Sequence, residues 1–146
     1  MNRAGVLLDT GPIVALLSRS DANHDRARRA FASCAPPFRC CEAVIAEACH
    51  LLSRVHREAP AEVLALGRKG VFTIGLSVDE EWSSLEFLLK KYADRPTSLA
   101  DACLIRMAEL HKEPRILTFD SDFGVYRWAR NRRFRQIDAS SRRPGP

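Results

Sequence analysis

The stretch VLLDTGPIVALL, residues 6 to 17, decides the fold of this chain. Its first three residues form a continuous apolar run, which is typical of a short parallel strand covered on both faces. Gly11 and Pro12 then open a second apolar segment, which we interpret as a helix. Asp9 therefore stands at the carboxyl end of a buried strand, a position at which a carboxylate calls for a structural or functional explanation.

The stretch RILTFDSDF, residues 115 to 123, repeats this pattern, because its apolar run also ends on an aspartate, Asp120. In open α/β sheets, ligands bind beyond the carboxyl ends of the strands. We therefore expect Asp9 and Asp120 at the same edge of one parallel sheet. A helix cap or an Asx turn explains either aspartate alone, but it is a weaker explanation for both together.

Short apolar runs alternate with longer helical patterns along the whole chain. This alternation predicts a three-layer α/β/α sandwich with a mainly parallel central sheet. The 146 residues suit one domain, which we assign to residues 1–138, followed by a basic tail over 139–146. We expect strands over residues 6–8, 38–40, 71–74, 116–119 and 134–137, and helices over 13–18, 25–33, 42–57, 61–68, 78–92 and 98–111.

A third acid, Glu47, falls on the predicted helix over residues 42–57. At 100° per residue it lies just off the edge of the apolar stripe, whereas Glu42 projects to the opposite side. The Glu47 side chain can therefore point along the edge of the core into a cleft. The alternative is that Glu47 is an ordinary surface residue. The stripe consists of Val44, Ile45, Ala48, Leu51, Leu52 and Val55.

A fourth acid, Asp101, shares the apolar face of the predicted helix over residues 98–111. A charge on that face needs a partner. Its spacing from Ser98 also fits a capping box, in which the two residues bond each other's backbone amides. The two interpretations are compatible, since an acid in the first turn can still present an oxygen to a site. Asp94, just before this helix, is interpreted as a loop residue.

Four carboxylates at one edge of a sheet oppose each other's ionisation when they lie within about 4 to 6 Å. A hard divalent cation resolves this conflict, and Mg²⁺ or Mn²⁺ takes oxygen ligands while leaving room for phosphate oxygens. Zinc is disfavoured, because the cysteines lack the paired short spacings of a tetrahedral site. The candidate catalytic and metal-binding residues, which we name the acid quartet, are Asp9, Glu47, Asp101 and Asp120.

The segments LLDTGPIVALL, VIAEACHLL, SLADACLIRMAE and ILTFDSDF together resemble the PIN domain, in particular the VapC-like toxins of toxin–antitoxin pairs. They occur in the family's order and extend over nearly the whole chain. The resemblance implies that the acid quartet binds metal, with Thr10 and Thr118 at the hydroxyl positions beside it. Asp94 and Asp122 match less constant acids of the family.

The resemblance also implies a function, namely cleavage of RNA by an Mg²⁺-dependent endoribonuclease that leaves a 5′-phosphate and a 3′-hydroxyl. Mn²⁺ is the alternative ion. Asp120 or Glu47 is the candidate to orient or deprotonate the attacking water, and the sequence does not choose between them. The rival interpretations are a stand-alone RNA-processing nuclease and a non-catalytic PIN-like module that binds RNA or a protein.

Three partner and location expectations follow. A cognate antitoxin is implied by the resemblance to toxins, and a homodimer by the surplus of large apolar residues within 78–92, such as Trp82 and Phe87. An odd count of five cysteines, with no secretory signal and no run of about 20 apolar residues, favours reduced thiols, the cytoplasm and no membrane span.

The C-terminal stretch RWARNRRFRQIDASSRRPGP, residues 127–146, contributes much of the formal charge of +5. Arginines interleaved with Trp128 and Phe134 suit a polyphosphate with exposed bases, through charged contacts and stacking. A solvated basic end, or a patch for an acidic partner protein, is an equal alternative.

Overall fold

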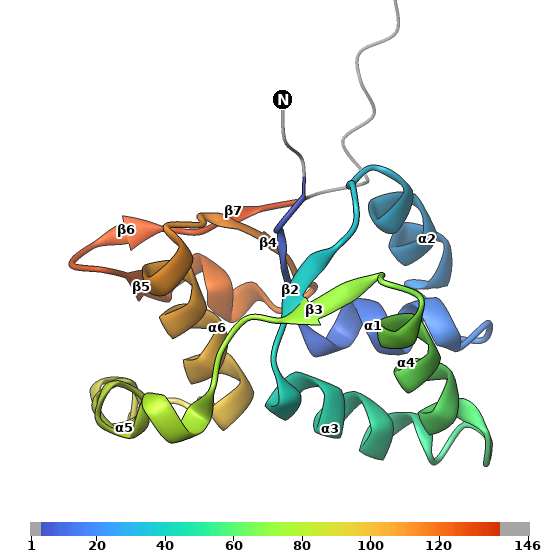
Figure 1. The fold of residues 1–146 in the computed structure, drawn as a ribbon, viewed down its shortest axis with the longest axis horizontal. Helices are drawn as coiled ribbons and strands as arrows, with labels where there is room; N and C mark the ends of the chain where they lie inside the picture. Colours follow the sequence, from blue (N-terminus) through green and yellow to red (C-terminus); the bar gives the residue numbers. More distant parts are fainter. Residues whose placement is uncertain (1–3, 138–146) are drawn as a thin grey trace, which may run out of the picture.

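A computed structural model describes residues 4–137, so the expected tail over 139–146 lies outside the described residues. Its main feature is a sheet with the strand order β3-β2-β1-β4-β7, in which every pairing is parallel (Figure 1). β1 (Leu7–Leu8) lies in the centre, between β2 (Phe38–Cys40) and β4 (Arg115–Leu117). β3 (Phe72–Ile74) and β7 (Arg135–Gln136) form the two edges.

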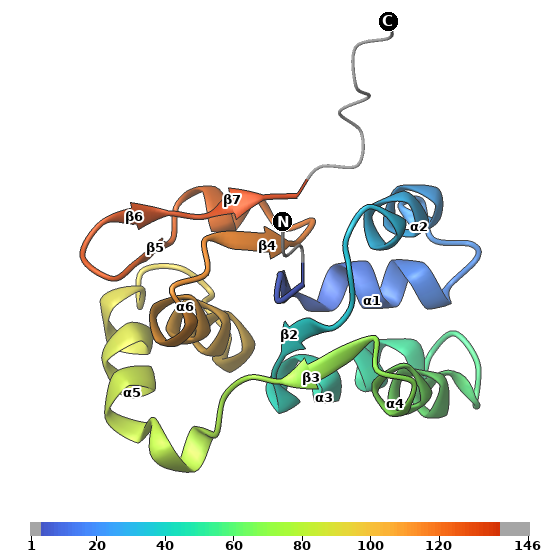
Figure 2. The ribbon, with the colours of Figure 1, turned by 45° about the horizontal axis from the view of Figure 1, so that its top comes forward.

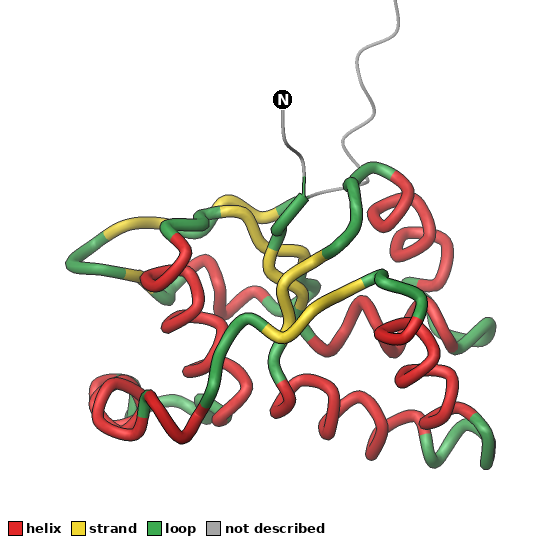
Figure 3. Tube along the Cα trace, in the orientation of Figure 1, coloured by secondary structure: helices red, strands yellow, loops and turns green. Residues whose placement is uncertain are grey.

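Helices cover both faces of this sheet. Figure 1 shows α1, α2 and α4 to one side of the strands and α5 and α6 to the other. In Figure 3 the strands at the centre of the sheet lie between these two groups of helices. The predicted three-layer α/β/α sandwich is therefore confirmed. The helices are α1 (Thr10–Leu17), α2 (His24–Ala32), α3 (Glu42–Leu52), α4 (Ala59–Arg68), α5 (Trp82–Lys91) and α6 (Leu99–His111).

The two central strands are buried on both faces, as their continuous apolar runs predict. Leu7, Leu8, Ile116 and Leu117 are all fully buried, and Leu8 pairs in register with Leu117. Because the strands are parallel and in register, the residues that follow them emerge at the same edge of the sheet. This register brings the segments after β1 and β4 together.

The helix predicted over residues 42–57 is too long. In the structure α3 ends at Leu52, where the Ser53 hydroxyl donates to the His50 carbonyl and the chain turns toward α4. Val55 lies beyond this end and is exposed, and Leu51 is exposed within α3, although the helical pattern places both in the core stripe.

The helix predicted over residues 78–92 is divided in two. A 3₁₀ turn, η1 (Val78–Glu80), precedes α5, and Glu81 lies between them. The Glu81 carboxylate accepts a 2.7 Å hydrogen bond from Arg106 of α6, which fixes the chain at this bend. A contact distant in sequence thus overrides a continuous local helical pattern.

The predicted strand over residues 134–137 is preceded by an element that the sequence pattern did not indicate. β5 (Arg127–Trp128) and β6 (Arg132–Arg133) form a two-stranded antiparallel ribbon. Figure 2 shows this ribbon at one end of the molecule, continuing into β7. In the described part of the chain no helix has the length and apolar character needed to cross a membrane.

Candidate active site

The acid quartet lines one cleft at the carboxyl edge of the central strands. Its members come from the ends of β1 and β4 and from helices α3 and α6, and the cleft has a volume of about 420 Å³. The structure thus brings together all four predicted residues, while their role in catalysis stays a prediction. The other lining residues are Thr10, Gly11, Val14, Asp21, Asn23, Leu51, Pro96, Ser98 and Phe119.

Asp9 is the most enclosed member, with only 6% of its surface exposed. It caps α1, which begins at Thr10 and thus earlier than predicted, and its two oxygens accept from Thr10 N (2.7 Å) and from the Thr118 hydroxyl (2.6 Å). Burial raises the Asp9 pKa from 3.8 to about 6 despite these hydrogen bonds, and the nearby Asp101 and Asp120 carboxylates add to the rise.

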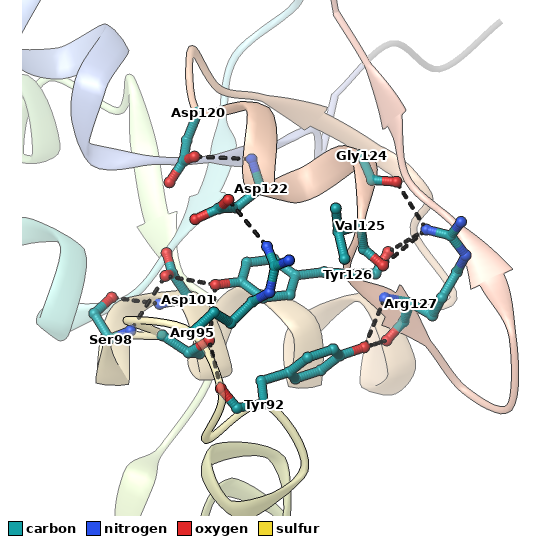
Figure 4. Close-up of polar contacts among 11 residues, drawn as sticks. Tyr92, Arg95, Ser98, Asp101, Asp120, Asp122, Gly124, Val125, Tyr126 and Arg127 are labelled. Atoms are coloured by element: carbon teal, nitrogen blue, oxygen red, sulfur yellow. Dashed lines mark hydrogen bonds and ion pairs between the residues drawn. The ribbon is translucent and has the colours of Figure 1, made fainter.

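Asp101 fills both of the roles that its spacing predicts. It forms a capping box with Ser98, and its Oδ2 also accepts a 3.1 Å hydrogen bond from the Tyr126 hydroxyl (Figure 4). Burial raises the pKa of this carboxyl group, its hydrogen bonds to Ser98 and Tyr126 oppose the rise, and the Asp120 charge adds to it. The cap therefore does not remove Asp101 from the cleft.

Asp120 and Glu47 are more open to solvent. Asp120 accepts from the Asp122 amide (2.9 Å), and its own amide donates to the Thr118 hydroxyl (3.0 Å). Glu47 accepts a 3.2 Å hydrogen bond from the Thr10 hydroxyl. Both threonines at the predicted hydroxyl positions therefore contact members of the acid quartet.

The two acids of lower rank do not line the cleft. Asp122 forms an ion pair with Arg95 at 3.1 Å, so its charge is matched within the fold (Figure 4). Asp94 is exposed in the turn before α6. Neither acid therefore adds a carboxylate to the lining of the cleft.

Sequence reasoning missed Tyr126, which supports Asp101 from outside the cleft. Its side chain is fully buried, its hydroxyl also bonds the Thr97 hydroxyl at 2.9 Å, and burial raises its pKa to about 12. Its ring packs edge-on against Tyr92 and Phe123. No local pattern indicates this role, because Tyr126 is distant from Asp101 in the sequence.

The donor set of the cleft fits a hard cation. Asp101, Glu47 and Asp120 each use one carboxylate oxygen in the hydrogen bonds above, and the other oxygen accepts none from the described residues. Within residues 4–137, however, no three Asp, Glu, His or Cys side chains are grouped closely enough to form a ready-made metal site. Mg²⁺ suits such a cleft, since it commonly takes one or two carboxylates and keeps several waters.

Comparison with known proteins places this cleft in a family. The family model for the PIN domain matches residues 6–129, so the chain belongs to the PIN domain family. Among solved structures the chain is similar to VapC20 of Mycobacterium tuberculosis, described as a toxin that cleaves the sarcin–ricin loop. The identity is 25%, the match covers 83% of this chain and 94% of that chain, and the TM-score is 0.73. No curated protein matches the chain.

The raised pKa of Asp9 makes a prediction about stability. Asp9 binds its proton more tightly in the folded state than in the unfolded state. Its contribution to the free energy of unfolding is therefore fully present below about pH 4 and is lost as the pH rises past 6. In metal-free protein at pH 8 we expect Asp9→Asn to increase the free energy of unfolding by up to about 3 kcal/mol. At pH 4 the difference should vanish. Urea unfolding in a chelator measures both values.

Asp94→Asn is the matched control, since Asp94 is exposed and lies outside the cleft. Its free energy of unfolding should differ from the wild type by the same small amount at both pH values. A loss of stability in Asp9→Asn at pH 8 would contradict the electrostatic conflict described above.

Proposed function

We propose that this protein is an Mg²⁺-dependent endoribonuclease that acts in the cytoplasm as the toxin of a toxin–antitoxin pair. The observation that carries the proposal is the single cleft in which four carboxylates from separate elements meet. Membership of the PIN family supports a nuclease, and the similarity to a toxin that cleaves the sarcin–ricin loop supports RNA as the substrate.

The cleft residues have different roles in the proposed hydrolysis of the phosphodiester. Bound Mg²⁺ supplies charge neutralisation at the phosphodiester and lowers the pKa of water. Asp9, Glu47, Asp101 and Asp120 would hold the ion. The Thr118 hydroxyl orients the Asp9 carboxylate, and the Tyr126 hydroxyl orients that of Asp101. Asp120 and Glu47, the more open acids, are the candidates to accept a proton from the attacking water.

The rival functions account less well for this arrangement. A module that only binds RNA or protein has no use for carboxylates that raise one another's pKa, as Asp101 and Asp120 do for Asp9. A stand-alone processing nuclease would use the same cleft and the same chemistry. It would differ from a toxin only in having no antitoxin partner. An aspartyl phosphatase needs a second aspartate two residues after the first, and Gly11 stands there.

The experiment that tests the proposal compares two glutamates on the same helix. Glu47 lines the cleft, whereas Glu42 is exposed in the first turn of α3 and does not. We expect Glu47→Gln, like Asp9→Asn, to slow cleavage of RNA by about 100-fold, the scale of one lost electrostatic partner. Glu42→Gln should cut at the wild-type rate. Gel electrophoresis of labelled RNA measures the rates and the product ends.

The same assay tests the metal. A chelator should stop cleavage by the wild type, and Mg²⁺ or Mn²⁺ should restore it. Wild-type activity in Asp9→Asn, or cleavage that continues in the chelator, would refute the assignment of the cleft. Equal losses in the two glutamine variants would show that α3 contributes in some other way.

A toxin needs an inhibitor, and the cleft indicates its chemistry. All charged side chains that line it in the described residues are acidic. We propose that an antitoxin segment fills the cleft and places an arginine or lysine where the cation binds. Co-expression with the product of the neighbouring gene should give a tight complex without nuclease activity. Inhibition that persists after the partner's basic residues are replaced would contradict this mode of binding.

We also propose a homodimer that uses α5. Leu85 and Leu88 of this helix are buried, yet Trp82 and Phe87 are 63% and 64% exposed. An apolar cavity of about 480 Å³ lies beside Trp82. Large exposed apolar side chains of this kind mark a contact surface.

Light scattering tests the dimer at micromolar concentration. We expect the wild type to be dimeric and Phe87→Asp to be monomeric, because the new charge cannot be buried at the interface. Ser53→Asp, at an exposed position after the end of α3, adds the same charge away from α5 and is the control. A monomeric wild type would refute the dimer.

A further inference from the structure

The acid cleft cannot by itself hold the phosphate backbone of RNA. Among the described residues, the charged side chains that line it are Asp9, Asp21, Glu47, Asp101 and Asp120, and none is basic. A bound cation offsets part of this charge at the reacting phosphate, but the neighbouring phosphates still meet an acidic surface. Lys and Arg contacts to phosphates supply a large share of the affinity of proteins for nucleic acids. Those contacts must therefore lie outside the cleft.

The β5–β6 ribbon and the adjoining β7 carry four arginines within six residues. Arg130, Arg132, Arg133 and Arg135 are all exposed. Within residues 4–137 none of the four has a carboxylate within 4.0 Å, whereas Arg95, Arg106 and Arg115 all form ion pairs. We name these four residues the arginine ribbon. Arg132 contacts the Trp128 ring, but none of the four charges is matched by a carboxylate of the described residues.

The aromatic residues of this segment serve as anchors, which corrects the stacking role suggested by the sequence. Trp128 is only 4% exposed, and its indole N–H donates to the Arg133 carbonyl at 3.1 Å. The Phe134 ring packs edge-on against Phe123, with 5.3 Å between the ring centres. The Trp128 ring is thus closed to a base, and the Arg132 guanidinium lies over it at 5.2 Å from the ring centre. Both rings anchor the ribbon, whose four arginines are exposed.

A further arginine, Arg127, ties the ribbon to the acid site. Its guanidinium donates to the carbonyls of Gly124, Val125 and Tyr126, and its amide donates to the Tyr92 hydroxyl (Figure 4). Tyr126 in turn bonds Asp101. β5 also packs against α6, which carries Asp101. The ribbon is therefore held at a fixed position relative to the cleft.

We propose that the arginine ribbon binds the phosphate backbone of the substrate RNA outside the cleft. The inference rests on the proposed function and adds the surface that gives it affinity. Residues 129–133 at the turn of the ribbon contain no large apolar side chain, so the ribbon lacks the apolar centre typical of a protein interface. Exposed guanidinium groups without acidic neighbours instead suit phosphates, which they can contact with two hydrogen bonds.

The test measures binding of a labelled RNA hairpin by fluorescence anisotropy in a chelator, so that nothing is cut. The double variant Arg130→Ala with Arg133→Ala should bind about 10-fold more weakly at low salt. Its log–log slope of affinity against salt should be smaller by about 1.4 to 1.8, the expected change for two lost phosphate contacts. The control is Arg68→Ala with Lys69→Ala, which removes the same charge at the end of α4, on the other side of the molecule (Figure 1). This control should bind as the wild type does.

One further double variant makes the outcome decisive. Arg130→Lys with Arg133→Lys keeps the charge and should recover most of the affinity, and thermal unfolding of each variant checks that the fold is retained. Equal losses in the ribbon and α4 variants would show a response to net charge alone and overturn the proposal. Normal RNA binding by the ribbon variant, with loss of a protein partner, would assign the surface to that partner. If the wild type binds through the ribbon but cleaves no RNA, the proposed function fails while this inference stands.

Discussion

The hydrogen bond from the Thr118 hydroxyl to Asp9 joins the ends of the two central strands, and the site is built around it. The same hydroxyl accepts from the Asp120 amide, so one side chain orients acids that follow β1 and β4. Asp9 is almost enclosed, and a buried carboxylate without such donors is costly. The parallel register of β1 and β4 is what brings Thr118 within reach, so the position of the site follows from the pairing of these strands.

The fold keeps its acids together against their mutual repulsion. Burial raises the pKa of both Asp9 and Asp101, and the Asp120 charge raises both further. The surrounding structure limits this conflict in two ways, because Arg95 matches Asp122 and the Tyr126 hydroxyl bonds Asp101. What remains is an excess of negative charge that faces solvent through the cleft. Such an excess has no structural use, and it suits a site that works with a cation bound.

The parts of the site that the sequence predicted are those governed by local rules. Asp9 follows a continuous apolar run and Asp101 stands three residues after a capping serine, so the sequence indicates both positions directly. The predicted position of Glu47 depends only on its place around the helix. That place is unaffected by the end of α3 at Leu52, before the predicted residue 57. Long-range contacts escaped prediction. Neither the bond between Tyr126 and Asp101 nor the bend at Glu81 held by Arg106 has a local signature.

The basic C-terminal segment shows why composition alone misleads about mechanism. Its arginines and aromatics alternate in the sequence, yet the Trp128 and Phe134 rings pack against the core while the four arginines of the ribbon are exposed. Arg132, the register partner of Trp128, lies over the face of that ring. The rings complete the core beside Phe123, and the guanidinium groups of the ribbon remain outside. Charges of opposite sign are thus kept apart within this protein, with carboxylates in the cleft and arginines on the ribbon. This separation matters for the proposed mechanism, because an arginine inside the cleft would pair with the carboxylates and take the place of the proposed cation.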